Sequence, residues 1–270
     1  MKISVITVSY NASGTILSAM DSVLRQKRDG FDLEYIVVDG ASTDGTVDII
    51  KEYAAKTSDQ RLTTNSFTFR WLSEHDQGLY DAMNKGIRMA TGDVVGIMNS
   101  DDYFTSDDSL AAVAAAFSPH PSPIDAVYAD IRFVKKGDET KTGRYYTGRF
   151  WRPWMHHIGY MPPHPSVYIR REWFKKLGGY KMGYGISADF ELMTRFFCKN
   201  KLRTKYLPKC LVTMRPGGVS TKNAKRNVDL NKENVRANRE NGYHSSLLLM
   251  LPKYAFRLIE LLLPRLNSKL

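Results

Sequence analysis

The stretch DVVGIMNSDD, residues Asp93–Asp102, decides the fold of this chain. An apolar run of strand character ends there in Asn99 and Ser100, followed by two adjacent carboxylates. Neighbouring carboxylates repel each other unless a cation or hydrogen-bond donors compensate their charge. The stretch is therefore either an ordinary turn after a strand or a point where something positively charged binds. The residues at the ends of the other strands bear on that choice.

Strand and helix signals alternate from the first residue onward. β-branched and apolar runs at 2–10, 33–40, 67–74 and 93–102 read as strands, and residues 16–24, 42–54, 78–92 and 106–117 have helical spacing between or after them. This rhythm predicts a Rossmann-like, mainly parallel sheet with helices on both faces. After a proline-rich loop, the runs 126–134, 164–174 and 206–214 predict further strands, and 186–200 predicts a helix.

Composition limits the class of protein. The chain has 270 residues, with 43% hydrophobic and 25% charged residues, which suits one large soluble domain or a domain with an appendage. Its two cysteines cannot build a disulfide framework and lack zinc-ligand spacing, which favours a reducing, cytosolic setting. The first residues do not resemble a signal peptide. We find no apolar run of about 18 residues, so a spanning helix is not expected.

The positive charge of the chain is concentrated in its C-terminal part. Residues 199–270 carry 16 Lys and Arg against 4 Asp and Glu, whereas residues 1–198 carry 23 against 24. Such a surplus indicates an anionic partner, either a membrane or a nucleic acid, or else a solvated basic face. The basic residues are interleaved with leucines, as in an interfacial helix, rather than with stacking aromatics. We therefore favour an anionic membrane surface over nucleic acid, with a packed C-terminal helix as the alternative.

Polar and acidic groups follow each of the first four strand signals. A single Asp after a strand is usually a turn residue, but in a parallel sheet these four strand ends meet at one edge. The chain has no G-x-G-x-x-G after the first strand and no phosphate-binding P-loop sequence. The remaining explanation is a nucleotide whose diphosphate is held by Mg²⁺ or Mn²⁺ on one or two carboxylates. Asp101 and Asp102 would hold the cation, and Asp39 would contact the base.

Five motifs occur in an order that resembles the family 2 glycosyltransferases of GT-A fold. They are VITVSYN, IVVDGASTDGT, SEHDQGLYDAMNKGI, ATGDVVGIMNSDD and SADFEL. The resemblance runs from about Lys2 to Ser220 and is closest to bacterial enzymes that build O-antigen, capsule and exopolysaccharide units. It implies a GT-A domain over residues 1–225, followed by a basic amphipathic helical segment over 226–270.

The resemblance also implies roles for individual residues. The family's D-x-D metal motif falls on Asn99-Ser100-Asp101, so its first Asp is replaced by Asn here. Asp101 becomes the leading metal ligand, with Asp102 as support. The donor nucleotide is expected to contact Thr7, Ser9, Tyr10, Asn11, Asp39, Asp44, Asp76, Asn84, Lys85, Asn99 and Ser100.

The acceptor side of the site is expected in the second half of the domain. The family's catalytic base opens a late helix and falls on Asp189, with Glu191 as the nearest substitute; acids are also common in first helical turns without catalysis. His164, Tyr180 and Tyr184 are expected near the acceptor, and Arg215 in a flap over the diphosphate. A purely structural His164 beside two prolines is an equal alternative.

Together these features predict an inverting, divalent-metal-dependent transferase. It would move a sugar from a nucleotide-sugar, expected to be a UDP-sugar, to a lipid-linked or oligosaccharide acceptor in surface polysaccharide synthesis. We expect a cytoplasmic protein, peripheral on the inner face of the bacterial cytoplasmic membrane. The alternative is a non-catalytic nucleotide- or glycan-binding module of the same fold, which the Asn at position 99 supports.

Overall fold

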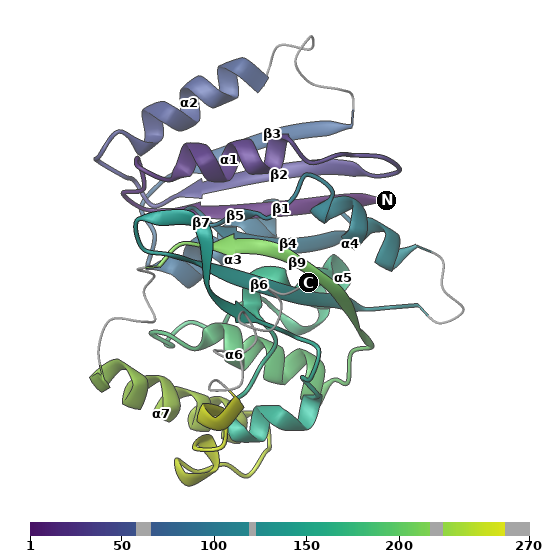
Figure 1. Ribbon diagram of the computed structural model, residues 1–270, viewed down its shortest axis with the longest axis vertical. Helices are drawn as coiled ribbons and strands as arrows, with labels where there is room; N and C mark the ends of the chain where they lie inside the picture. The colour runs from purple at the N-terminus through teal and green to yellow at the C-terminus, as the bar shows by residue number, and fades with distance from the viewer. Residues whose placement is uncertain (58–65, 119–122, 217–223, 257–270) are drawn as a thin grey trace.

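The computed structural model describes residues 1–57, 66–118, 123–216 and 224–256 (Figure 1). Within these residues the chain forms one nine-stranded mixed sheet flanked by helices on both faces. Eight strands follow each other across the sheet, and β7 (Asp138–Tyr146) pairs with β6 beside them. The order is β3 (Phe67–Ser73), β2 (Asp32–Asp39), β1 (Lys2–Ser9), β4 (Val94–Asn99), β8 (Tyr168–Arg170), β6 (Ala126–Lys135), β9 (Thr204–Met214) and β5 (Tyr103–Phe104).

The four N-terminal strands form the parallel half of the sheet. β1 pairs with β2 and β4, and β2 pairs with β3, all in parallel. The register aligns Ser9 with Asp39 and Asp39 with Ser73, while Asn99 ends β4 opposite Val8. The polar residues that follow these strands therefore meet at one edge, as the sequence predicts. We call it the carboxyl edge.

The C-terminal strands bring a second chain segment to the same edge. β8 runs antiparallel to both β4 and β6, so β6 points in the direction of β4. β9 is parallel to β6 and therefore also ends at the carboxyl edge. The short β5, just after the two aspartates, pairs with the end of β9. This pairing places Arg215, which follows β9, beside the acidic stretch.

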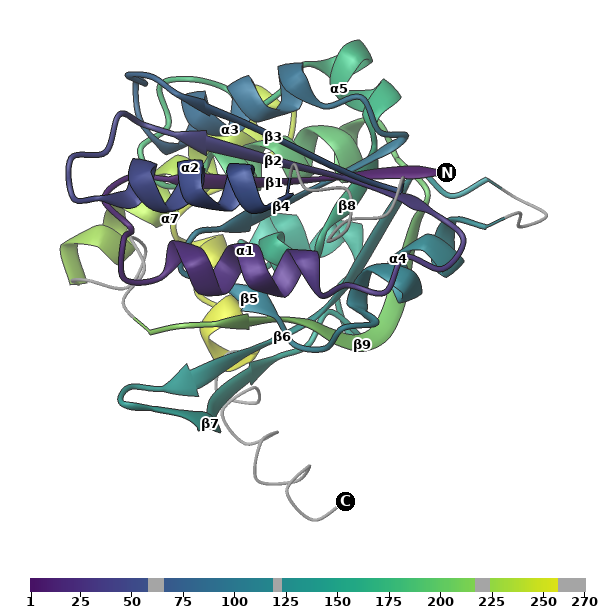
Figure 2. The same ribbon diagram turned by 90° about the horizontal axis from the view of Figure 1, so that it is seen from above.

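Helices bury one hydrophobic cluster on each face of the sheet. Val5 of β1 packs with α1 (Ile16–Leu24), α2 (Thr46–Thr57) and α4 (Ser109–Phe117), whereas its neighbour Ile6 packs on the opposite face. This alternation follows from the two-residue period of a strand. Figure 2 shows α3 and α5 on one side of the parallel strands and α1 and α4 on the other. The second face carries α3 (Leu79–Met89), α5 (Arg171–Leu177), α6 (Ala188–Met193) and α7 (Ala224–Glu240).

Some elements differ from the sequence prediction. The expected strand over 164–174 is reduced to β8, because a 3₁₀ turn precedes it and α5 begins directly at Arg171. Glu172 in the first turn and Lys175 and Lys176 in the last turn of α5 match the helix dipole, a signal that the strand prediction overlooked. The helix expected over 186–200 is α6 followed by a π-helical turn, Thr194–Lys199.

The segment after β9 packs against the domain. Ala237 of α7 is fully buried in the cluster that also holds α3 and α6. The segment that contains α7 therefore packs on the core. The predicted domain boundary at 225 falls at the start of α7. Residues 257–270, which hold the last part of the expected amphipathic tail, lie outside the described residues. Within the described residues, no helix combines the length and apolar character that crossing a bilayer requires.

Candidate active site

Asp39, at the end of β2, is the centre of the hydrogen-bond network at the carboxyl edge. Its carboxylate is fully buried and accepts bonds from the hydroxyl groups of Ser9 (3.0 Å), Ser42 (2.5 Å) and Ser73 (2.8 Å). The backbone N–H of Ser42 donates a fourth bond of 2.9 Å. Four bonds fill the acceptor capacity of a carboxylate. Asp39 thus ties together the ends of β1, β2 and β3, and no acceptor position of its carboxylate is left for the predicted bond from the nucleotide base.

The loops after β1 and β2 are held together by reciprocal bonds. The N–H of Asn11 donates to the Ser42 hydroxyl (2.8 Å), and the Asn11 side-chain carbonyl accepts from the N–H of Thr43 (3.0 Å). Asn11 has a φ of 48°, a left-handed conformation that Asn tolerates better than most residues. Asp44 accepts bonds from Thr46 and from the N–H of Ser13, which lowers the pKa of its carboxyl group. Asp44 therefore holds the start of α2 in place.

A small surface above Gly40 brings Tyr10 and Asp76 together. A Cβ atom on Gly40 would lie 2.5 Å from an Asp76 carboxylate oxygen and 3.3 Å from the Tyr10 ring. Tyr10 is 67% exposed, and the Asp76 side chain is kept in place by the N–H of Gly78 at 2.8 Å. An exposed aromatic ring beside a carboxylate suits the stacking and hydrogen bonding of a nucleotide base. The structure therefore groups two of the predicted donor residues at the carboxyl edge.

Asn99, Asp101 and Asp102 form an acidic site with unsatisfied oxygen atoms. The Asn99 side-chain N–H donates to Asp102 at 3.2 Å, but the Asn99 carbonyl oxygen and the second Asp102 carboxylate oxygen are buried without a hydrogen-bond partner. Burial raises the pKa of Asp101, and burial together with the Asp101 charge raises that of Asp102 well above its ordinary value. Such oxygens are stabilised by a bound cation.

This donor set fits a divalent cation that a second ligand helps to hold. Within the described residues no three His, Cys, Asp or Glu side chains are gathered as a metal site. Mg²⁺ and Mn²⁺ commonly bind through one or two carboxylates together with water and phosphate oxygens. Asp101, Asp102 and the Asn99 carbonyl match that pattern.

Arg215 lies directly beside the acidic site. Its guanidinium group donates to the backbone carbonyl of Asp101 (3.1 Å), to Ser18 (3.1 Å) and to both oxygens of Glu139 (2.5 and 3.1 Å), and it lies over the Tyr103 ring. Arg215 is predicted to contact the diphosphate, and it lies beside Asp101. Its guanidinium group is paired with Glu139 in this structure. The rest of the expected flap, residues 217–220, lies outside the described residues.

Asp189 sits in the first turn of α6. Its carboxylate accepts the N–H of Phe190 at 2.8 Å, and burial raises its pKa to about 6, with a further contribution from the charge of Glu233. Tyr80, at the start of α3, donates to the carbonyl of Ile186 at 2.5 Å, which brings the loop before α6 to the carboxyl edge. A carboxylate with this pKa is ionised at pH 7 and is a stronger base than an ordinary Asp.

Two tyrosines and a histidine line the region near Asp189. Tyr80 and Tyr180 stack with ring centroids 5.6 Å apart, and the charge of Asp189 helps to raise the pKa of both. The Tyr180 hydroxyl is 2.7 Å from Nε2 of His164, whose pKa burial lowers to about 4. His164 is therefore neutral at pH 7 and fixes Tyr180. Both tyrosines predicted to stack on sugars, Tyr180 and Tyr184, are 5% exposed, so the prediction of sugar stacking is not supported for either.

Several other predicted residues have structural partners instead. Glu191 is fully buried and paired with Arg195 (3.0 Å) and Lys181 (3.1 Å), so it cannot replace Asp189 as a base for an acceptor. Thr7 is buried within β1 and accepts a bond from Tyr35 at 3.1 Å, away from the carboxyl edge.

Two residues of α3 hold loops rather than pointing at a ligand. Lys85 donates to the carbonyl of His75 (2.7 Å) and pairs with Glu74 (2.9 Å), which fixes the loop that carries Asp76. Asn84 is bonded to the backbone of Tyr180. Both lie next to the site and act on it through these loops.

Sequence reasoning missed Glu233 of α7. Its carboxylate accepts bonds from three consecutive backbone N–H groups, those of Gly185 (2.8 Å), Ile186 (2.9 Å) and Ser187 (2.8 Å). These groups directly precede the first turn of α6, so Glu233 positions Asp189. No local motif announces this contact, because the two segments lie far apart in the chain.

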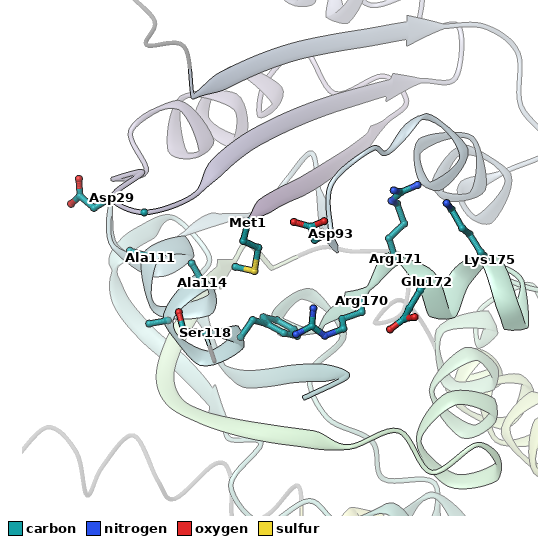
Figure 3. A pocket seen from close by; sticks show the side chains of 13 residues that line it. Met1, Asp29, Asp93, Ala111, Ala114, Ser118, Arg170, Arg171, Glu172 and Lys175 are labelled. Carbon is teal, nitrogen blue, oxygen red and sulfur yellow. The ribbon is translucent and has the colours of Figure 1, made fainter. Parts of the chain in front are cut away.

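A cavity among the described residues lies away from this site. It has a volume of about 690 Å³ and is lined by Asp93 before β4, Arg170 at the end of β8, Arg171 at the start of α5, and Phe117 of α4 (Figure 3). These residues mark the sheet edge opposite to the carboxyl edge, since Asp93 precedes β4. The cavity is therefore not the donor site that the sequence predicts.

Comparison with known proteins agrees with these features. The family model Glycosyl transferase family 2 matches residues 4–178. A PGL/p-HBAD biosynthesis glycosyltransferase of Mycobacterium bovis is 32% identical over 204 residues, 76% of this chain and 73% of that protein. An uncharacterized glycosyltransferase of Mycobacterium tuberculosis is 28% identical over 200 residues, 72% of this chain and 68% of its own length.

Solved structures share the fold at lower identity. S. aureus TarS in complex with UDP-GlcNAc matches with a TM-score of 0.64 and 20% identity over 88% of this chain and 66% of that one. A mannosyltransferase of Pyrobaculum calidifontis in complex with GDP-Man and Mn²⁺ matches with a TM-score of 0.58 and 22% identity, over 87% and 64%. The chain thus spans just under two thirds of both solved proteins. Family model, relatives and fold agree: the chain has the GT-A fold and belongs to glycosyl transferase family 2.

Proposed function

We propose that the protein is an inverting transferase that moves a sugar from a nucleotide diphosphate to the hydroxyl group of an acceptor. The observation that carries this proposal is the placement of Asp189 in the first turn of α6 with a pKa of about 6, joined through Tyr80 to the edge that gathers Tyr10, Asp39 and Asp76. A base and a nucleotide-binding surface at one edge are the two parts that direct transfer requires.

The donor is held by the carboxyl edge. The nucleotide base would lie against Tyr10 and Asp76 above Gly40. A side chain at position 40 would collide with both residues. Asp39 keeps the three strand ends in register under the nucleotide, with Ser9 as its partner. The solved neighbours carry UDP-GlcNAc or GDP-Man. The UDP-sugar predicted from the motifs is our proposal for this chain.

Asp101 and Asp102 would hold the divalent cation, together with the carbonyl oxygen of Asn99. When bound, Mn²⁺ or Mg²⁺ neutralises negative charge on the diphosphate as the sugar–phosphate bond breaks. The raised pKa values of both carboxyl groups support this role, because a nearby cation would return them to the ionised state. Arg215, which already touches the backbone of Asp101, would add a second positive charge beside the diphosphate.

Asp189 would accept the proton of the acceptor hydroxyl as that oxygen attacks the sugar. Attack from the side opposite to the departing diphosphate inverts the configuration at the sugar carbon. The neighbouring Tyr80–Tyr180 stack and the neutral His164 keep the surroundings of Asp189 poor in competing charge. Desolvation by these groups raises the basicity of the carboxylate toward the working pH.

The acceptor is proposed to be lipid-linked or an oligosaccharide, and the enzyme to work at the inner face of the cytoplasmic membrane. The basic surplus of residues 199–270 supports that location. A relative is named for PGL/p-HBAD biosynthesis, a name that concerns that protein.

A screen of nucleotide-sugars tests the proposal. Free nucleotide is measured with Mn²⁺ or with EDTA, for the natural protein and for Asp189→Asn. We expect release from one donor, dependent on Mn²⁺ and reduced at least about 100-fold in the variant. Binding of the nucleotide with no turnover of any donor would instead favour the non-catalytic module that Asn99 suggests.

A further inference from the structure

Two segments far apart in the sequence place large apolar side chains together on the outside of the protein. One segment precedes and includes the 3₁₀ helix η1 (Pro153–Ile158), and the other includes the 3₁₀ helix η5 (Leu248–Met250). The two helices pack against each other. The exposed side chains are Phe150, Trp154, Leu247, Leu248, Leu249 and Leu251, which we call the leucine–tryptophan surface.

Exposure is large at the centre of this surface. Leu248 is 76% exposed, Trp154 59% and Leu251 56%. Single apolar residues on a protein surface need no explanation, but several large exposed apolar side chains on two segments that pack together are typical of an interaction site. The yellow C-terminal segment lies at the end of the molecule remote from α2 (Figure 1).

The backbone that carries these exposed side chains is anchored to the rest of the protein by packing and hydrogen bonds. Met250 is fully buried, and its sulfur would lie 2.6 Å from a Cβ atom on Gly159 at the end of η1. Arg239 of α7 donates two bonds to the carbonyl of Ser245 (3.0 and 2.9 Å). The rings of His157 and Tyr243 meet edge to face at 4.7 Å. The leucines are thus presented on a fixed scaffold.

Every charged side chain within residues 145–160 and 241–256 is positive. Arg149 and Arg152 are exposed beside Phe150 and Trp154, and the Arg149 guanidinium lies 5.9 Å from the Phe150 ring. Neither residues 145–160 nor residues 241–256 contain an Asp or Glu. A second copy docked about a two-fold axis would bring these arginines together with no acid to pair them. An anionic, partly apolar partner suits the surface better.

We propose that the leucine–tryptophan surface docks the enzyme to an anionic phospholipid membrane. Leucines and an interfacial tryptophan enter the boundary between headgroups and acyl chains, while Arg149 and Arg152 contact lipid phosphates. The inference rests on the proposed function, in which the acceptor is bound to a membrane. It extends that function by naming the residues that contact the membrane. It assigns the contact to a folded part of the domain before the terminal segment 257–270.

Vesicle co-sedimentation of the full chain tests the inference. Vesicles of phosphatidylglycerol mixed with phosphatidylcholine are compared with pure phosphatidylcholine, for the natural protein and for Leu248→Ser/Leu251→Ser. We expect binding to the anionic vesicles only, weakened by salt and reduced on the order of 100-fold by the double substitution. Arg149→Gln/Arg152→Gln should lower binding roughly tenfold and reduce its salt dependence. Leu17→Ser, an equivalent change on exposed α1, should bind as the natural protein does.

A second measurement separates the membrane from other occupants. Trp154→Phe should remove most of the fluorescence shift that anionic vesicles induce, because Trp154 is the exposed tryptophan of the surface. The inference is overturned if Leu248→Ser/Leu251→Ser binds anionic vesicles as tightly as the natural protein does. So does a dimer in sedimentation velocity that the double variant abolishes, or a lowered melting temperature of that variant with unchanged vesicle binding. Asp189→Asn should bind vesicles as the natural protein does. Failure of the catalytic proposal can therefore be distinguished from failure of the membrane proposal.

Discussion

Asn84 and Tyr180 are joined by a reciprocal pair of hydrogen bonds. The side-chain N–H of Asn84 donates to the carbonyl of Tyr180, and the N–H of Tyr180 donates to the side-chain carbonyl of Asn84, both at 2.8 Å. A Cβ atom on Gly179 would lie 2.1 Å from that Asn84 oxygen, so glycine is required there. The clasp joins α3, beneath the parallel strands, to the loop that leads into α6. It connects the donor half of the site to Asp189.

Breaking the clasp should affect both stability and turnover. We expect Asn84→Ala to lower the free energy of unfolding by about 2 kcal/mol, because two partly buried backbone groups lose their partner. Turnover should fall more than donor affinity, since the loop before α6 loosens. Urea unfolding and steady-state kinetics measure the two effects. Asn84→Asp, which keeps the acceptor but loses the donor, should fall between; an unchanged Asn84→Ala would show that the clasp is dispensable.

The pH dependence of transfer should report the titration of Asp189. Its pKa of about 6 predicts that kcat/KM falls below pH 6 as the carboxylate takes up a proton and ceases to be a base. The Glu233 charge contributes to raising that pKa, so Glu233→Gln should move the acid limb to lower pH. The profile is measured with a fixed donor between pH 5 and 9. An acid limb near pH 4 in the natural enzyme would exclude Asp189 as the base.

Replacement of Asp189 should stabilise the protein at neutral pH. Because its pKa is higher in the folded protein, about 6, than the ordinary 3.8, the folded state binds the proton more tightly. The free energy of unfolding therefore falls as pH rises through this range and stays lower above it. Asp189→Asn removes the penalty and should gain on the order of 1–3 kcal/mol at pH 7.5, with little gain at pH 3.5. Denaturant unfolding at the two pH values measures this gain. An equal gain at both pH values would show that it does not come from the ionisation of Asp189.

Most of the parallel half of the fold could be predicted because β1, β2 and β4 are nearly uninterrupted buried runs bounded by turn residues. Ile3–Val8 and Val94–Met98 need no tertiary context to be recognised. β7 could not, since its charged and glycine-containing sequence becomes a strand only by pairing with β6. The brief β8 is also set by its neighbours, because antiparallel pairing with β4 and β6 defines it. The helix α5 could have been predicted, since Glu172 in its first turn and the lysines in its last turn match the helix dipole.

Candidate site residues could be predicted where a residue's chemistry is local to its strand end. Asp101 and Asp102 follow β4, and one buried Asp102 carboxylate oxygen has no hydrogen-bond partner, which fits the expected cation site. Glu191 was misjudged because its partner Arg195 also lies on the helix face turned inward, which residue type alone does not reveal. Glu233 was missed because its bonds reach backbone groups 46 to 48 positions earlier in the chain.

The Asn at position 99 offers a change that separates stability from metal binding. Asn99→Asp places a third carboxylate beside Asp102 and removes the N–H that Asp102 accepts at 3.2 Å. Without metal the variant should melt lower than the natural protein, because like charges in a buried site repel. With Mn²⁺ and UDP it should regain this loss and bind the ion more tightly. Melting temperatures with and without Mn²⁺ test this; a lowered melting temperature that Mn²⁺ does not restore would argue against a cation at the site.

Binding of UDP measured by calorimetry, with Mn²⁺ and with EDTA, tests the acidic site most directly. For the natural protein we expect binding that Mn²⁺ strengthens at least about tenfold, since the cation offsets the negative charge of the two carboxylates and of the diphosphate. Asp101→Asn/Asp102→Asn should remove the Mn²⁺ dependence while the protein stays folded. Equal affinity for UDP with Mn²⁺ and with EDTA, or unchanged Mn²⁺ dependence in the double variant, would contradict the proposed role of the two aspartates.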